Sequence, residues 1–247
     1  MYCFITYIFV TIIIITKVQV KIQLRRVSNI KTKKQTAEIV RLLAQCYPIP
    51  KDGLEYEYPW RLMVAVRLSA QCTDVRVNEV TKILFKKYPA LTDLAKATPT
   101  QIEAIVKPCG LGKSKARDIH AACNMLLEKY GGELPSTMEE LLSIPGVGRK
   151  SANLILGDIF GQPAIVADTH CIRISNRIGF VKSKDPLKVE MALRKVVAPE
   201  DGNDFCHRLV MHGRAVCTAR KALCESCNLA PLCNEGLRWA KAQNYTT

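Results

Sequence analysis

The sequence predicts an all-α protein, and three observations lead to this expectation. From Thr36 onward, apolar residues recur at spacings of three and four, which is the period of one face of a helix. Signals that start and stop helices, such as Thr-Pro at 98–99 and Gly-Gly at 131–132, divide this pattern into segments. Outside the N-terminal stretch, no segment alternates apolar and polar residues as a half-buried strand does.

Polar caps and helix-breaking residues mark where each element begins and ends. The first helix ends before Pro48. Thr98 and Gln101, with a proline between them, predict a capped helix start, and Ser136 with Glu139 predicts a capping box for a short helix ending near 144. The predicted helices cover residues 36–46, 60–70, 77–84, from 99 on, 116–130, 137–144, 149–160, 169–178, 186–197 and 205–216.

The composition narrows the possible classes of protein. The chain has 247 residues, 48% of them apolar, which is enough to form a core without disulfides. It has 36 Lys and Arg against 22 Asp and Glu, a formal net charge of +14. This excludes an acidic solvating protein, a collagen-like chain and a low-complexity disordered chain. The charge favours a polyanionic partner, nucleic acid ahead of a membrane surface.

Residues 1–30 form an apolar and then basic leader. Residues 2–16 carry no charge, but fifteen apolar residues fall short of the roughly 20 that a membrane helix needs. A secretory signal would need a basic start and a small-residue cleavage site, which the leader lacks. Three interpretations stay open: a mis-assigned start codon, a marginal signal anchor, or a strand-prone tail. On each of them the working domain lies in the cytosol.

Four of the eleven cysteines lie within seventeen residues near the C-terminus, at the spacing C-x6-C-x2-C-x5-C. They are Cys217, Cys224, Cys227 and Cys233. Four thiolates at this density suit tetrahedral zinc or a [4Fe–4S] cluster, and the presence of only one C-x2-C pair slightly favours iron–sulfur. The loop after Cys217 carries Arg220 and Lys221, which we interpret as a phosphate contact fixed by the metal site.

A glycine-rich turn joins two predicted amphipathic helices at about 138–160. Gly146 and Gly148 allow successive backbone N–H groups to point outward together, at the positive end of the helix that starts near Arg149. A phosphate can approach such a turn closely, and the contact reads no base. An ordinary corner between helices is the alternative. The flanking apolar pattern and the Gly-Arg-Lys triplet favour a helix-hairpin-helix that grips DNA.

Lys150 and Asp168 are candidates for chemistry. Lys150 lies in the first turn of the helix after the glycines, where it is a phosphate contact or an amine nucleophile that forms a Schiff base. Asp168 precedes the helical run at 169–178, where it is an N-cap or a carboxylate that moves protons and stabilises positive charge on a sugar. Spacing alone leaves both alternatives open.

Taken together, the motifs resemble bacterial endonuclease III. They are IPGVGRKSA at 144–152, VADTH at 166–170, the four-cysteine tail, LSAQCTD at 68–74 and GLGKSKA at 110–116. The resemblance covers roughly residues 31–240. It implies two helical domains with a DNA-binding cleft between them: a six-helix barrel at 52–162 with the helix-hairpin-helix, and a domain of 31–51 plus 163–241 that ends in the [4Fe–4S] loop.

The resemblance also implies a role for each motif. Lys150 matches the lysine that attacks the anomeric carbon, and Asp168 matches its acidic partner. Gln71 matches the residue that fills the gap left by the flipped nucleotide, and Leu111 matches the wedge beside it. Gly146 and Gly148, with Arg149, match the phosphate-binding turn. The four cysteines match the ligands of the [4Fe–4S] cluster.

The implied function is base-excision repair. A bifunctional DNA glycosylase and apurinic/apyrimidinic lyase would remove oxidised pyrimidines from double-stranded DNA and cleave 3′ to the lesion, without a soluble cofactor. The resemblance implies a monomer in the cytoplasm, associated with the nucleoid. The alternatives are an adenine-type mismatch glycosylase, which lacks a lysine at the position of Lys150, and a non-catalytic metal-bearing DNA-binding module.

Overall fold

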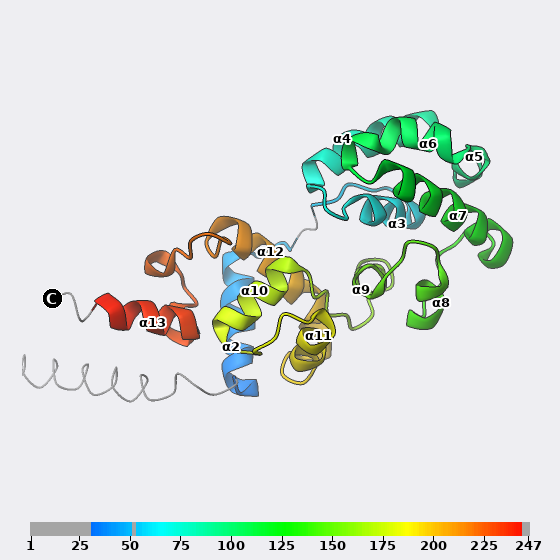
Figure 1. Cartoon of the computed structure of the whole chain (residues 1–247). Helices are drawn as coiled ribbons and strands as arrows, with labels where there is room; N and C mark the ends of the chain where they lie inside the picture. The colour runs from blue at the N-terminus through cyan, green and yellow to red at the C-terminus, as the bar shows by residue number, and fades with distance from the viewer. Residues whose placement is uncertain (1–30, 51–52, 244–247) are drawn as a thin grey trace, which may run out of the picture. The chain divides into compact units, whose positions relative to one another are not determined.

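The computed structural model describes residues 31–50 and 53–243, and these divide into two compact units (Figure 1). The first unit combines the part up to Pro48 with Thr169–Val197 and the part from Leu209 on. The second unit combines Ile49–Asp168 with Ala198–Arg208. Over the described ranges the regular structure is helical, and the β-pairing consists of one isolated bridge between Cys217 and Ala222. The predicted all-α class is confirmed.

The second unit is built around α3, which is buried on nearly every side. Seven of its ten residues are buried, and its sequence is apolar except for Arg61 and Arg67. It packs against α4, α7 and α9, and α7 in turn covers α5 and α6. The helices are α3 (Pro59–Leu68), α4 (Asp74–Lys87), α5 (Leu91–Lys96), α6 (Pro99–Val106), α7 (Gly112–Tyr130), α8 (Met138–Ser143) and α9 (Arg149–Asp158), with short 3-10 turns η1 (Lys107–Cys109) and η2 (Pro199–Asp201).

Of the two helix caps predicted in this unit, one is observed at the predicted residues and one is shifted. Thr98 and Gln101 form the predicted capping box of α6. The predicted box of Ser136 and Glu139 is wrong by one residue, because Thr137 is the N-cap of α8 and its hydroxyl accepts from the Glu140 amide at 3.3 Å. The sequence offers the same Ser/Thr-x-x-Glu spacing in both registers. The carbonyl of Ser136 instead accepts a hydrogen bond from the Gln162 side chain.

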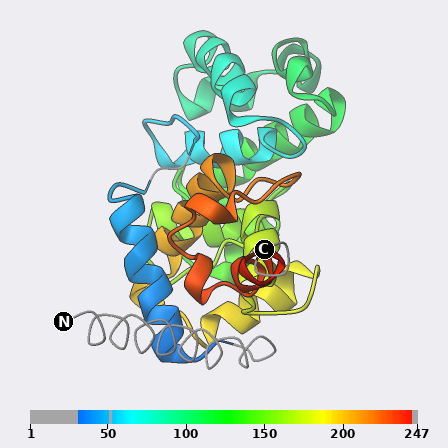
Figure 2. The ribbon, with the colours of Figure 1, turned by 90° about the vertical axis from the view of Figure 1, so that its left-hand side faces the viewer.

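In the first unit, α2 lies beside the C-terminal segment (Figure 2). The Lys31 amine donates to Asn234 Oδ1 at 2.8 Å, and the Asn228 amide donates to the Cys46 sulfur at 3.2 Å. Contacts between residues about two hundred positions apart therefore close this unit. Its helices are α2 (Lys33–Cys46), α10 (Thr169–Ile178), α11 (Pro186–Arg194), the end of α12 (Gly202–Ala215) and α13 (Asn234–Gln243), with 3-10 turns η3 (Cys224–Ser226) and η4 (Ala230–Leu232).

Beyond Pro48, the chain passes between the two units after Asp168, after Val197 and inside α12, after Arg208. The Asp158 carboxylate, at the end of α9, accepts hydrogen bonds from Asn203 Nδ2 and His207 Nε2, both at 2.7 Å. The Val166 amide also donates to the Cys206 sulfur. These long-range bonds hold the first half of α12 to the second unit, and periodicity within the helix gave no sign of them.

Two helices were missed by the sequence reasoning, α5 and α13. The six residues of α5 are too short to display a full period, and α13 is mostly polar with only two buried positions. Among the described residues, no helix is long and apolar enough to cross a membrane. The leader at 1–30, with its three interpretations, lies outside the described residues.

Replacing Asp158 with alanine tests whether α9 holds the first half of α12. Asp158→Ala removes the acceptor of two part-buried hydrogen bonds, so we expect the free energy of unfolding in urea to fall by about 2–4 kcal/mol. Asp185→Ala removes an exposed carboxylate that caps α11 and should cost about 1 kcal/mol. An equal or smaller loss for Asp158→Ala than for this control would contradict the assignment of residues 198–208 to the second unit.

Candidate functional site

The glycine turn between α8 and α9 has the geometry that the sequence predicts. Gly146 has a φ of +80°, a conformation that favours glycine, and the Val147 amide donates to the Ile144 carbonyl at 3.1 Å. Gly148 is the N-cap of α9, has no capping side chain, and has open space where a Cβ would lie. The turn therefore leaves room for an anion to approach the first-turn amides of α9.

An ion pair supports this turn from below. Arg67 of α3 donates to the Asp118 carboxylate of α7 at 2.7 and 3.0 Å, and both side chains are less than one-fifth exposed. A Cβ at Gly146 would lie 2.8 Å from the Arg67 side chain and 3.0 Å from Asp118 Cβ. Gly146 is thus required both by its backbone conformation and by close contact with this pair.

The two candidate catalytic residues both belong to the second unit. Lys150 is exposed at the second position of α9, directly after Arg149. Asp168 is partly buried at the end of a segment whose four preceding residues are buried, and its amide donates to the Val166 carbonyl at 2.9 Å. Asp168 immediately precedes α10.

The two candidate insertion residues lie on strained turns of the same unit. Gln71 has a φ of +56° and Leu111 has a φ of +51°, and they are the non-glycine residues with positive φ in the part of the chain that the structure describes. This conformation costs an ordinary residue roughly 1–2 kcal/mol. Both side chains are exposed, and that of Leu111 is 57% exposed despite being apolar. Strain and exposure together are typical of residues kept for contact with a partner.

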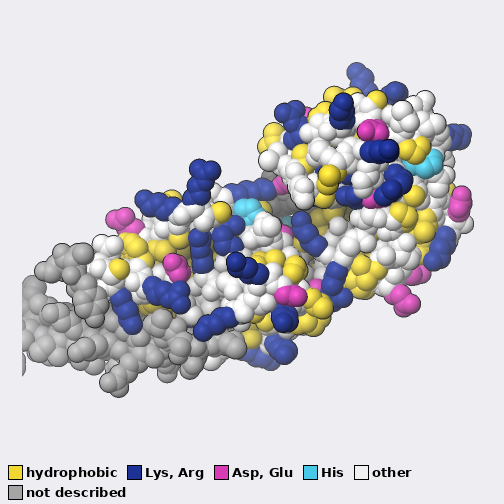
Figure 3. All heavy atoms as spheres, in the orientation of Figure 1, with side chains coloured by type: hydrophobic (Ala, Val, Ile, Leu, Met, Phe, Trp, Pro, Cys, Tyr) yellow, Lys and Arg dark blue, Asp and Glu magenta, His cyan; other side chains and the backbone are white. Residues whose placement is uncertain are grey.

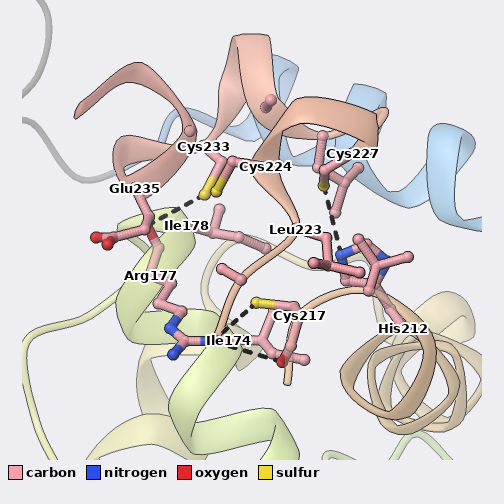
Figure 4. A pocket seen from close by; sticks show the side chains of 15 residues that line it. Ile174, Arg177, Ile178, His212, Cys217, Leu223, Cys224, Cys227, Cys233 and Glu235 are labelled. Atoms are coloured by element: carbon pink, nitrogen blue, oxygen red, sulfur yellow. Dashed lines mark hydrogen bonds between the residues drawn. The ribbon is translucent and has the colours of Figure 1, made fainter. Parts of the chain in front are cut away.

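In the first unit, the four clustered cysteines line one cavity (Figure 4). The cavity holds about 350 Å³, counting the solvent at its mouth, and its other walls are mainly apolar. None of the four thiols is paired in a disulfide. No three His, Cys, Asp or Glu side chains of the described ranges converge closely enough to hold a single metal ion.

The surroundings of the sulfurs suit thiolate ligands. Burial raises the pKa of the Cys233 thiol to about 11, while the backbone N–H groups of Gly236 and Glu235 act in the opposite direction. The Arg177 guanidinium donates to the Cys217 sulfur at 3.2 Å. Such donors stabilise negative sulfur, and soft sulfur ligands suit zinc or iron–sulfur centres. The chemistry of these donors therefore suits a thiolate-bound metal group, although a single ion would not meet three of them in the described structure.

His212 completes the wall next to Cys227. Its Nε2 lies 3.6 Å from the Cys227 sulfur, and its Nδ1 lies 3.2 Å from the Tyr47 hydroxyl. Burial lowers the pKa of His212 to about 4, so its imidazole is neutral at neutral pH. Burial also raises the pKa of the Cys227 thiol.

The loop that carries Arg220 and Lys221 is a closed turn rather than a free arm. The Thr218 hydroxyl donates to the Lys221 carbonyl at 2.6 Å, and the Arg177 guanidinium donates to the carbonyls of Thr218 and Ala219. Both cations are exposed at the tip of this turn. The turn fixes the direction in which the two charges are presented.

Sequence reasoning missed the residues that hold this loop. Arg177 contacts the cysteine loop at four atoms, and Arg173 donates to the Cys217 carbonyl at 2.9 Å. Both arginines come from α10, about forty positions earlier in the chain. Their spacing of four on an amphipathic helix was a signal that they share one face, but nothing local indicated what this face would meet.

The surface agrees with the composition. On the face drawn in Figure 3, Lys and Arg side chains are spread over much of the surface, and Asp and Glu side chains are fewer. This excess of positive charge favours polyanions without distinguishing among them.

Comparison with known proteins gives a consistent result. The family model described as "HhH-GPD superfamily base excision DNA repair protein" matches residues 64–199. Endonuclease III of Synechocystis sp. is 45% identical over 204 residues, covering 82% of this chain and 93% of that protein. Endonuclease III of Bacillus subtilis is 41% identical with the same coverages, and that of Escherichia coli is 41% identical, covering 81% and 95%.

Solved structures give the same relationship. A trapped covalent intermediate of endonuclease III with DNA matches with a TM-score of 0.80 and 40% identity, covering 85% of this chain and all of that chain. A thermostable thymine-DNA glycosylase matches with a TM-score of 0.74 at 22% identity, which shows a shared fold. The chain therefore belongs to the endonuclease III family, within the HhH-GPD superfamily of base excision DNA repair proteins.

Proposed function

We propose that this protein is a bifunctional DNA glycosylase and abasic-site lyase that acts on double-stranded DNA containing oxidised pyrimidines. One observation carries the proposal: in a chain of this family, an exposed lysine lies in the first turn of the helix that follows the glycine hairpin. The hairpin offers backbone amides to a phosphate, and Lys150 lies beside them. A phosphate contact that reads no base, next to a nucleophilic amine, suits an enzyme that recognises damaged nucleotides in any sequence.

The proposed reaction starts with extrusion of the damaged nucleotide, because a base inside the duplex cannot be reached. Gln71 and Leu111 enter the gap and offset the lost stacking. The neutral amine of Lys150 attacks the anomeric carbon, the glycosidic bond breaks, and the base leaves with a proton. The opened sugar is then held on Lys150 as a protonated imine.

Strand cleavage and release follow from the imine. Loss of a proton from the adjacent sugar carbon expels the 3′ phosphate by β-elimination, and water then hydrolyses the imine and restores the lysine. Asp168 assists base loss by moving protons and by stabilising positive charge at the sugar. No step needs a soluble cofactor.

We further propose that Cys217, Cys224, Cys227 and Cys233 hold a [4Fe–4S] cluster. The support is the spacing shared with the family and the four thiols that line one cavity. When bound, the cluster would supply structural or redox chemistry rather than hydrolysis. The residues around it would fix the Arg220–Lys221 turn as a second phosphate contact, through Arg177.

The nucleophile is tested by trapping the imine. Incubation with abasic duplex DNA and borohydride should give a reduced covalent adduct, and Lys150→Ala should lower its yield to background, because no other group is proposed to form the bond. Lys129→Ala, which removes an exposed lysine at the end of α7, should trap as the unmodified protein does. Undiminished trapping by Lys150→Ala would exclude Lys150 as the nucleophile.

The role of Asp168 is tested separately. Asp168→Asn should slow base removal about 10²- to 10⁴-fold.

The second phosphate contact is tested by the salt dependence of binding. Arg220→Glu or Lys221→Glu should weaken binding to duplexes of every sequence alike and reduce the slope of log K against log salt by about 0.9 for each lost phosphate contact. Lys96→Glu, a charge reversal at an exposed lysine of α5, serves as the control. An unchanged slope for both loop variants would rule out their proposed role.

The metal group is tested by elemental analysis. The purified protein should be brown and contain about four iron atoms and four inorganic sulfides per chain. Cys227→Ala should lose the iron, whereas Cys123→Ala, which removes a buried thiol from the other unit, should keep it. A colourless protein carrying one zinc ion would contradict the cluster and leave the zinc interpretation.

A further inference from the structure

Lys115 is a lysine whose side chain is completely buried, and its amine is fully hydrogen-bonded. Its exposed fraction is 0%, and its Nζ donates to the carbonyls of Leu68, Ala70 and Cys109, each at 2.8 Å. An ammonium has three hydrogens, and each of them meets one of these acceptors. Its partners are all main-chain carbonyls, so the group binds backbone rather than forming an ion pair.

The three carbonyls come from the two turns that carry the insertion residues. Leu68 is the last residue of α3, and Ala70 directly precedes Gln71. Cys109 ends η1 and lies two residues before Leu111. The backbone amide of Lys115 also donates to the Leu111 carbonyl at 3.0 Å. One residue therefore holds both turns, which lie about forty positions apart in sequence.

These two turns are the ones that need an outside constraint. Gln71 and Leu111 both have left-handed backbone conformations that ordinary residues avoid. Neither of the two positions with positive φ is occupied by glycine, which would adopt this conformation without strain. Such conformations persist where surrounding contacts determine them, and the amine of Lys115 supplies contacts to both turns.

The burial of Lys115 carries a cost that the fold must offset. Burial lowers the pKa of Lys115, while the Cys109 and Cys72 thiols act in the opposite direction. A purely space-filling role would be served as well by an apolar side chain of the same length. The ammonium at this position therefore indicates a requirement for its three hydrogen bonds.

We propose that Lys115 is a positioning residue that joins the Gln71 turn and the Leu111 turn into one rigid unit, so that both side chains are held ready to enter the DNA together. This inference rests on the proposed function and adds a residue to it. Lys115 contacts no substrate. It acts by fixing the carbonyls next to the two side chains that do.

A mutant cycle tests this role. Lys115→Met keeps the length of the side chain and removes the ammonium. The single-turnover rate of strand cleavage on duplex DNA with an oxidised pyrimidine should fall about 10- to 100-fold, because a small displacement of the groups that position a substrate lowers the reaction rate by about this factor. In a background where Gln71→Ala and Leu111→Ala are already present, Lys115→Met should cost less than about twofold, since nothing remains to be positioned.

A fluorescence readout separates positioning from general destabilisation. A duplex with 2-aminopurine opposite an uncleavable tetrahydrofuran abasic analogue reports insertion as a change in stacking. We expect Lys115→Met to reduce the fluorescence change to that of the double alanine variant, and Lys129→Met, a matched change at the exposed end of α7, to leave it at the unmodified level. Far-UV circular dichroism checks that each variant is folded.

The outcomes distinguish this inference from the proposed function. If the unmodified protein does not cleave abasic DNA, the proposed function fails. If it does, but Lys115→Met loses the same factor in both backgrounds, the positioning role is wrong. Should Lys115→Met not fold, Lys115→Arg is used in the same cycle: it keeps the charge but cannot place a single nitrogen among three carbonyls. If the Lys115 substitution slows cleavage less in the double-alanine background than in the unmodified protein, the inference is supported. If it slows cleavage by the same factor in both, the inference is overturned.

Discussion

The packing of α3 against α7 is the contact on which the candidate site of the second unit depends. Arg67 of α3 and Asp118 of α7 form the mostly buried ion pair next to Gly146, and the Lys115 amine of α7 donates to the Leu68 carbonyl at the C-terminal end of α3. The glycine turn, the Gln71 turn and the Leu111 turn are thus all fixed by one pair of helices. A buried helix interface is rigid, so groups mounted on it keep their places without help from a ligand.

In the first unit, too, side chains of a regular helix hold an irregular segment in place. Arg173 and Arg177 of α10 hold the backbone and one sulfur of the cysteine loop, which is otherwise irregular. Irregular backbone has few internal hydrogen bonds, and charged donors from a regular helix satisfy its carbonyls. In both units a helix therefore supplies cations to the main chain of a turn, and these cations are distinct from the exposed Arg220 and Lys221, for which a phosphate contact is proposed.

The helical class, the glycine turn and the cysteine group could be predicted because each depends on local spacing. Apolar periodicity, Gly-x-Gly and C-x6-C-x2-C-x5-C are visible in the chain itself. The register of the cap at Thr137 was not predictable, since Ser136 offers the same pattern. The hydrogen bonds of Lys115 to Leu68 and Ala70, and those of Asn203 and His207 to Asp158, join distant segments, which single-sequence spacing does not encode. The roles proposed for Gln71 and Leu111 come from the resemblance to a known family. Gly110 and Gly112 mark a turn around Leu111, but no local spacing indicates what either side chain would contact.

The most direct test of the central claim is to locate the covalent bond to DNA. Borohydride reduction of the complex with abasic duplex, followed by proteolysis and mass spectrometry, identifies the modified residue. The account predicts that the sugar fragment is attached to Nζ of Lys150, in the peptide that follows the Gly146–Gly148 turn. Attachment to another amine, such as that of Lys113 or the chain terminus, would contradict it.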